Sequence, residues 1–236
     1  MCTLSYRLTE SGYELFFNRD EQRSRAQAIL PHIDSMLNAI YPVDPIGQGT
    51  WLAVHQSGLC FALLNYYQAQ KKALPGEFVS RGEIILKLLA RQGNVIDNLK
   101  KLPLSNYQPF QLCVFPADLN ATNNQLLFLQ WDGQRLTEQS LPTFFTSSSV
   151  DYPQVYQARK SAFEQIVSFV EPTTEQLLCF HQYQQSEGKL SVKMSREDAH
   201  TVSFSHIIVN DKISFDYIDY LDDKHHHCFL NRCELT

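Results

Sequence analysis

The sequence has little of what marks a membrane, secreted or nucleic-acid-binding protein. No apolar run approaches the ~18 consecutive residues of a membrane span, and no charged segment followed by an apolar stretch and a cleavage site indicates a secretory signal. Only 19% of the residues are charged, and 20 Lys and Arg against 25 Asp and Glu give a net charge of −5. The basic residues are also scattered, so the positive patch of a nucleic-acid binder is missing. We therefore expect a cytoplasmic protein with no membrane span and no nucleic-acid partner.

The cysteines show no disulfide framework. There are six in 236 residues, whereas small disulfide-stapled domains use a denser and more compact spacing. Three of them lie in apolar runs and are expected to be small core residues: Cys60, Cys113 and Cys179. We expect reduced thiols throughout, and only the position of Cys2 suggests reactivity.

The sequence does have enough apolar material for one ordinary domain. It is 44% hydrophobic, and a chain of this length can bury a sizeable core. Hairpin-like segments flank helical ones in the middle of the chain, which indicates the α+β class. We therefore predict a single domain over residues 1–236.

The first twenty-one residues predict a β-hairpin. Residues 2–8 alternate at period two, Tyr13–Phe17 is β-prone, and the Thr9–Gly12 segment between them has turn chemistry. A loop of two to four residues centred there would place Cys2 opposite or diagonal to residues 19–21, Arg19, Asp20 and Glu21. A thiol and a charged cluster would then lie within side-chain reach.

Cys2 is a candidate nucleophile. Cells usually excise an initiator Met that precedes a residue as small as Cys, so Cys2 is expected to carry a free α-amine beside its thiol. That amine titrates near ~7.7–8.0 and can serve as the base for the thiol. A guanidinium beside the thiol would lower the thiol pKa further, and Arg19 is the candidate.

Five motifs in order carry a resemblance to the NRDE family, which includes the transport and Golgi organization protein 2 homologues. They are Cys2-Thr3-Leu4, Asn18-Arg19-Asp20-Glu21, Gly49-Thr50-Trp51-Leu52, Leu64-Asn65-Tyr66 and Ser80-Arg81-Gly82-Glu83, and a later block at residues 195–204 extends the match. That family in turn resembles cysteine-type N-terminal nucleophile (Ntn) hydrolases such as penicillin V acylase and bile salt hydrolase. The resemblance implies a four-layer αββα sandwich of two antiparallel sheets.

The resemblance also implies roles for site residues. Asp20 would orient the α-ammonium, and Asn65 would help to hold the oxyanion, because a neutral amide donor stabilises negative charge. Arg81 and Arg196 become candidates for binding the substrate. Ser148 is a third candidate, since Ser147-Ser148-Ser149 stands where family members often have Ser-Asn, so that a hydroxyl or a backbone amide would have to contribute there.

Other segments give less specific expectations. Residues 24–40 have apolar residues at helical spacing, interrupted by Pro31, and are expected to be helical or irregular. A helix is expected over Pro153–Val170, with Arg159 outside its apolar face. A second hairpin is expected from residues 51–55 and 59–65, with Thr50 facing Asn65 in its tightest register.

Two functions are consistent with these observations. The first is hydrolysis of a small N-acyl substrate at its amide bond through a Cys2 thioester, which needs no cofactor or metal. The alternative is a non-catalytic protein that binds a small hydrophobic ligand such as haem, with an axial ligand from the tail that contains His225–His227, Cys228 and Cys233. Zinc binding by this tail is less favoured because adjacent residues on a strand point to opposite faces. A homo-oligomer is possible in either case.

Overall fold

The computed structural model describes residues 2–69, 78–140, 142–168 and 170–233. The chain divides into two compact units, which we describe separately. The first unit contains Met1–Arg25, Leu119–Asn124 and Pro142–Phe229, and the second contains Ala26–Asp118, Gln125–Leu141 and Leu230–Thr236. Among the described residues, no helix has both the length and the apolar character needed to cross a membrane.

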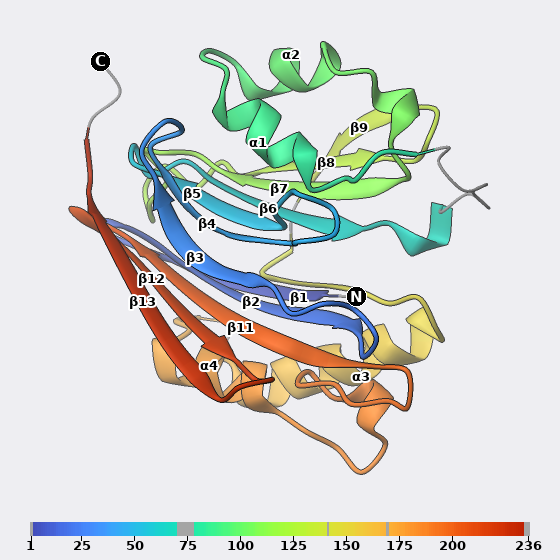
Figure 1. Cartoon of the computed structure of the whole chain (residues 1–236). Helices are drawn as coiled ribbons and strands as arrows, with labels where there is room; N and C mark the ends of the chain where they lie inside the picture. Colours follow the sequence, from blue (N-terminus) through green and yellow to red (C-terminus); the bar gives the residue numbers. More distant parts are fainter. Residues whose placement is uncertain (1, 70–77, 141, 169, 234–236) are drawn as a thin grey trace. The chain divides into compact units, whose positions relative to one another are not determined.

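A six-stranded sheet forms the first unit, with helices α3 (Tyr152–Ile166) and α4 (Thr174–Gln182) on one of its faces (Figure 1). A short 3-10 helix, η3 (Gly188–Leu190), follows α4. In sheet order the strands are β10 (Phe144–Ser147), β1 (Cys2–Thr9), β2 (Gly12–Gln22), β11 (Ala199–Val209), β12 (Lys212–Asp219) and β13 (Lys224–Asn231).

The predicted first hairpin is confirmed. Thr9 pairs with Gly12 across a two-residue turn, and this register places Cys2 directly opposite Arg19. Gly12 cannot carry a side chain, because a Cβ there would lie 1.8 Å from the Val209 carbonyl oxygen of β11. The turn and the neighbouring strand therefore both hold the register that the hairpin needs.

Aromatic side chains fill the space between this sheet and its helices. Phe16, Phe144 and Phe204 of the strands pack with Phe163 of α3 and Phe180 of α4. Ring contacts such as Phe163 to Phe180, with centroids 5.0 Å apart and nearly perpendicular, have the edge-to-face geometry that aromatic pairs prefer. This core fixes both helices on the sheet.

A polar network lies within this aromatic core. His181 of α4 is fully buried, and its ring nitrogens lie 3.0 Å from Asn18 Oδ1 and 2.8 Å from Ser5 Oγ. Asn18 also donates to the carbonyl oxygens of His181 and Val192. His181 is therefore a core histidine with satisfied hydrogen bonds, and Asn18 of the NRDE-like motif serves packing against α4.

A seven-stranded antiparallel sheet forms the second unit, and its strands pair in chain order. They are β3 (Ile29–Asp34), β4 (Ala39–Val43), β5 (Leu52–His55), β6 (Cys60–Asn65), β7 (Phe110–Phe115), β8 (Leu127–Trp131) and β9 (Leu136–Gln139). Helices α1 (Glu83–Leu89) and α2 (Val95–Lys100) lie on one face of this sheet (Figure 1), and 3-10 helices occupy Tyr67–Ala69 and Leu104–Asn106. The predicted α+β class with two antiparallel sheets is confirmed.

Most of residues 24–40 are not helical or irregular as expected, because they supply β3, the turn after it and the start of β4. Asp34 Oδ1 accepts hydrogen bonds from the N–H groups of Met36 and Leu37 at 2.8 and 3.0 Å, and Asn38 adopts a left-handed φ of 49°. These features close a tight turn. Met36 is 88% exposed, so the apolar spacing in this segment does not report a buried helical face.

The motifs that contain Gly49 and Gly82 meet within the second unit. The Thr50 N–H donates to the Gly82 carbonyl at 3.1 Å, and a Cβ on Gly49 would lie 2.3 Å from the Gly82 carbonyl carbon. Glycine is required at such a close backbone approach. These motif residues therefore have a packing role of their own.

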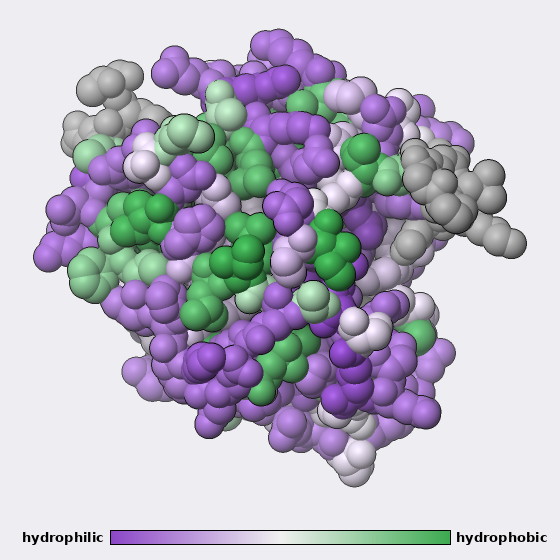
Figure 2. Space-filling model, in the orientation of Figure 1, coloured by the Kyte–Doolittle hydropathy of each residue, from purple (hydrophilic) through white to green (hydrophobic). Residues whose placement is uncertain are grey.

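On the face shown in Figure 2, hydrophobic residues form small areas separated by hydrophilic ones.

His181 provides a pH test of the first unit. Burial lowers the pKa of His181 to about 3, whereas a histidine in an unfolded chain titrates near ~6.5. Below ~6.5 the unfolded state therefore binds a proton that the folded state does not bind. The contribution of His181 to stability is present above pH ~6.5. It is lost, at up to ~1.4 kcal/mol per pH unit, as the pH falls toward the pKa that His181 has in the folded state.

We expect His181→Gln to reduce the loss of unfolding free energy between about pH 6.5 and about pH 5, by roughly 1–2 kcal/mol relative to wild type. Urea unfolding at several pH values measures this slope. His225→Gln, at an exposed position of the same unit, is the matched control. An unchanged slope in the His181 variant would contradict a neutral buried imidazole.

Candidate active site at the start of the first strand

The start of β1 is held between two neighbouring strands. Cys2 pairs with Ser147 of β10 on one side and with Arg19 of β2 on the other. The three residues are 8%, 1% and 5% exposed, respectively. Thus the candidate nucleophile lies inside the sheet and has a defined neighbour on each side.

Both backbone groups of Cys2 are engaged by hydroxyls of β10. The Cys2 N–H donates to Ser147 Oγ at 3.1 Å, and the Cys2 carbonyl accepts from Thr146 Oγ1 at 3.1 Å. Our sequence reasoning singled out Ser148 in this serine run and missed Ser147. Ser147 is recognised only from the pairing of β10 with β1, because that pairing places the last residue of β10 opposite Cys2.

Strand alternation sets the direction of the Cys2 side chain. The neighbouring Thr3 contacts Arg159 of α3, and Asn18, the neighbour of Arg19, contacts His181 of α4. Successive side chains on a strand point to opposite faces. Cys2 and Arg19 therefore share the face that points away from these two helices.

The thiol of Cys2 is strongly desolvated. Burial raises the pKa of the Cys2 thiol to about 11, and the charge of Asp20 adds to the increase. Arg19 lowers the pKa, as expected, but its effect is smaller than that of burial. Burial therefore outweighs the effect of Arg19 here, and reaction near neutral pH needs a base that removes the thiol proton.

Arg19 extends the charged cluster toward the surface. Its Nη2 lies 3.1 Å from Glu21 Oε2, and the same carboxylate oxygen lies 3.8 Å from Arg25 Nε. The Arg19 side chain is 6% exposed and that of Glu21 is 26% exposed. The structure thus brings Arg19 next to Cys2, as the hairpin register predicts.

Asp20 contacts a fully buried arginine that the sequence reasoning placed wrongly. Arg159 Nη2 lies 3.5 Å from Asp20 Oδ2, with both side chains 0% exposed. Thr201 Oγ1 donates to Asp20 Oδ1 at 2.6 Å. Burial lowers the pKa of the Arg159 guanidinium, and the charge of Asp20 opposes that shift. The ion pair joins β2 to α3 behind the nucleophile.

Arg159 was expected outside the apolar face of its helix, and that expectation is wrong. Val155, Arg159, Ala162 and Phe163 are the buried residues of α3, and spacings of three and four residues put them on one face. The helical period therefore contained the signal. It was overlooked because charged residues are rarely fully buried unless they are paired, and the pairing with Asp20 spans most of the chain.

Asn65 and Arg81 belong to the second unit. Asn65 ends β6, and its Nδ2 donates to Tyr67 Oη at 2.9 Å, whereas Arg81 Nη1 donates to the Pro109 carbonyl at 3.0 Å. The expected pairing of Thr50 with Asn65 is wrong. Leu52 pairs with Ala62, and extending that register would bring Thr50 opposite the residue before Asn65.

Ser148 and Arg196 have local partners. The Ser148 hydroxyl donates to the Val150 carbonyl at 2.5 Å and accepts from the Val150 N–H at 3.3 Å. Arg196 makes a bidentate ion pair with Asp198, with distances of 2.9 and 2.8 Å. The positive charge of Arg196 also contributes to lowering the Arg159 pKa. The roles of Ser148 and Arg196 in binding a substrate stay predictions.

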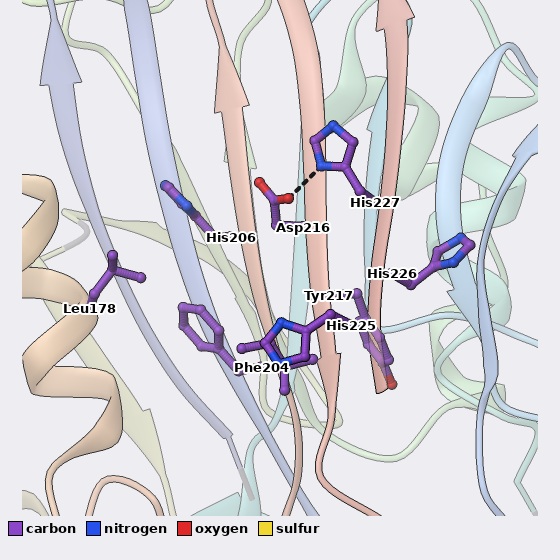
Figure 3. Close-up of a pocket in the computed structure, with 9 residues that line it drawn as sticks. Leu178, Phe204, His206, Asp216, Tyr217, His225, His226 and His227 are labelled. Atoms are coloured by element: carbon purple, nitrogen blue, oxygen red, sulfur yellow. Dashed lines mark hydrogen bonds and ion pairs between the residues drawn. The ribbon is translucent and has the colours of Figure 1, made fainter. Parts of the chain in front are cut away.

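The histidine run His225–His227 lies on β13 and lines a pocket of about 300 Å³ (Figure 3). His227 hydrogen-bonds to Asp216 of β12, and His226 Nε2 lies 3.2 Å from Cys228 Sγ. The three histidines are thus not directed at one point. Among the residues that the structure describes, no group of three or more His, Cys, Asp or Glu side chains could hold a metal ion.

Comparison with known proteins identifies a family and a fold. A family model described as Transport and Golgi organisation 2 matches residues 1–218. A search of curated proteins found no match. Among solved structures, the C2A mutant of conjugated bile acid hydrolase from Clostridium perfringens is 11% identical, with a TM-score of 0.55, and the match covers 97% of this chain and 92% of that chain.

A second solved structure gives the same result. The Caenorhabditis elegans ortholog of N-acylethanolamine-hydrolyzing acid amidase is 10% identical, with a TM-score of 0.55, and the match covers 87% of this chain and 92% of that chain. At this level of identity the likeness shows the fold. That fold is the Ntn-hydrolase fold, in agreement with the resemblance that the sequence motifs carry.

The buried ion pair generates a stability prediction. Asp20→Asn removes the counter charge of a fully buried guanidinium, which typically costs about 3–5 kcal/mol. Asp198→Asn is the matched control, because the Asp198 side chain in its ion pair with Arg196 is 67% exposed and pairs at the surface contribute little. Urea unfolding of both variants measures the difference. Similar losses in the two variants would contradict the structural role of the pair.

Proposed function

Since the chain belongs to the Transport and Golgi organisation 2 family, we propose that it is an Ntn amidohydrolase with Cys2 as its nucleophile. The reaction is hydrolysis of the C–N bond of a small N-acyl substrate through a thioester. One observation carries the proposal: the register of β1 holds a cysteine at position 2 between Ser147 and Arg19. A fold shared with two hydrolases gives it context, and the one from Clostridium perfringens was solved as a mutant at its own Cys2.

Removal of Met1 is the activating step in this proposal. It would convert the Cys2 nitrogen from an amide into an amine, and an α-amine titrates near ~7.7–8.0. Burial holds the thiol pKa well above that range, so the amine is the base that the buried thiol requires. Ser147 Oγ, 3.1 Å from this nitrogen, would accept one N–H and leave the nitrogen lone pair for the thiol proton.

The chemistry then proceeds in two stages. Sγ attacks the substrate carbonyl carbon while the thiol proton moves to the α-amine, and collapse of the tetrahedral intermediate breaks the C–N bond as that proton passes to the leaving amine. Water, deprotonated by the α-amine, attacks the thioester, and the proton returns to sulfur as the acid leaves. No other reactant is consumed.

The remaining residues have proposed roles of different kinds. Arg19 is proposed to bind the acyl side of the substrate, and Asp20 to position the start of β1 through its contact with Arg159. Asn65 is proposed, from the family resemblance, to donate to the oxyanion, and Arg81 and Arg196 to attract an anionic group.

All six cysteines are free thiols, which supports a reducing compartment such as the cytoplasm.

The first experiment determines the state of the N-terminus. Intact mass and N-terminal sequencing of the purified protein are expected to show that Met1 is absent. A protein made with one Lys inserted between Met1 and Cys2, which prevents excision, is expected to fold and to lack activity. Retention of Met1 in the natural protein would contradict the mechanism and would favour the ligand-binding alternative.

The second experiment measures hydrolysis. Conjugated bile acids and N-acylethanolamines are the starting substrates, because the two structural neighbours are named for acting on these classes. Cys2→Ala is expected to reduce kcat/KM by about 10³-fold or more, as loss of a nucleophile does in other hydrolases. Cys179→Ala is the matched control, because Cys179 of α4 is exposed and is not the core residue that its apolar run predicts. Equal activity of wild type and Cys2→Ala would exclude Cys2 as the nucleophile.

A further inference from the structure

We infer that Arg159 is a positioning residue for Cys2. This inference rests on the proposed function in one respect, that Cys2 is the nucleophile. Arg159 does not contact a substrate in this account. It acts through hydrogen bonds and charge on the strands that hold Cys2.

A chain of hydroxyls connects Arg159 to the backbone of Cys2. Arg159 Nη1 lies 2.6 Å from Thr3 Oγ1 and 2.8 Å from Thr146 Oγ1, and the two hydroxyl oxygens are 3.0 Å apart. Thr146 Oγ1 in turn lies 3.1 Å from the Cys2 carbonyl oxygen. All four side chains along this route are buried.

The direction of these hydrogen bonds follows from proton counting. A hydroxyl has one proton, and the Thr146 proton goes to the Cys2 carbonyl, which can only accept. Thr146 Oγ1 must therefore accept from Arg159 and from Thr3. A guanidinium has no acceptor atom, so Arg159 can only donate. Each hydrogen bond along the route is therefore donated in the direction from Arg159 toward the Cys2 carbonyl. Loss of Arg159 would remove the donor that both hydroxyls share.

The charge of Arg159 acts on the same point. Arg159 pairs with Asp20, whose negative charge raises the Cys2 thiol pKa, and Arg159 is itself close enough to interact electrostatically with Cys2. It therefore offsets the effect of Asp20 on the nucleophile. Without it, the negative charge of Asp20 would raise the Cys2 thiol pKa with less opposition.

Stability alone does not explain a charge at this position. Replacement of a buried ion pair by apolar residues of similar volume is often neutral or stabilising. In addition, Nε of Arg159 is buried and has no hydrogen-bond partner among the described residues, which is itself costly. The presence of a guanidinium at this position, despite its burial and its unsatisfied Nε, is consistent with a role in the site.

The test compares Arg159→Met and Arg159→Lys with Lys160→Met. Lys160 is the next residue of α3, and its side chain is 45% exposed, so Lys160→Met removes one positive charge from the same helix at the surface. The readout is the pH profile of Cys2 alkylation by iodoacetamide, followed by the mass of the N-terminal peptide. Cooperative thermal unfolding establishes that each variant is folded.

Arg159→Met is expected to shift the alkylation profile upward by about one pH unit, so that Cys2 reacts about tenfold more slowly near pH 8. Lys160→Met is expected to stay within about twofold of wild type. A folded Arg159→Met variant with a wild-type profile would overturn the inference. The readout needs no substrate, so absence of hydrolysis by the wild type would overturn the proposed function and leave this result standing.

Arg159→Lys keeps the inference testable if the Met variant does not fold. An ammonium keeps the charge but lacks the planar fork that reaches two hydroxyls and a carboxylate. We expect an alkylation profile close to wild type and, with an active substrate, kcat at least about tenfold lower while KM changes less than about twofold. Thr146→Val, which keeps both charges and removes the connecting hydroxyl, should reproduce that pattern. Full turnover in Arg159→Lys and Thr146→Val would overturn the positioning role.

Discussion

The first unit depends on a buried positive charge that must be matched. Arg159 has no exposed surface, and such a group is tolerated only when a counter charge and hydrogen-bond acceptors surround it. The carboxylate comes from β2, and the acceptors come from β1 and β10. One side chain of α3 therefore helps to specify how three adjacent strands and their covering helix meet.

This arrangement separates two tasks on the same strands. The side chains of Thr3, Asn18 and Asp20 face the helices and are used for hydrogen bonds that hold the unit together. The alternate residues, Cys2 and Arg19, point the other way. A strand pair can thus be rigid on one face and carry reactive groups on the other, which is how a thiol can be held still without contacts to its sulfur from the helices.

The parts of the site that the sequence predicts are those set by local chemistry. The turn at residues 9–12 fixes the hairpin, and the hairpin fixes Cys2 opposite Arg19, so a short loop converts sequence spacing into geometry. The parts that it does not predict depend on distant partners. Ser147 reaches Cys2 only after most of the second unit has intervened in the sequence. The complete burial of Arg159 depends on its pairing with Asp20, which is distant in the sequence.

The two wrong structural expectations in the second unit have different causes. In residues 24–40 the apolar spacing fits a helix by coincidence, and side-chain capping by Asp34 together with pairing to β4 favours strands. In the second hairpin the loop has three residues instead of two. Gly58 takes a left-handed φ of 92° there, and the added residue moves the register by one position, so that Thr50 does not face Asn65.

The strand order of the first sheet also affects when the sheet can form during synthesis of the chain. β1 and β2 are made first, yet β1 needs β10 and β2 needs β11 as neighbours, and these lie far along the chain. Synthesis of the stretch between Gln22 and Ala199 takes roughly 10–35 s at ~5–20 residues per second. During that interval the sheet that buries Cys2 cannot be complete, so an aminopeptidase can act on the nascent chain before Cys2 is buried.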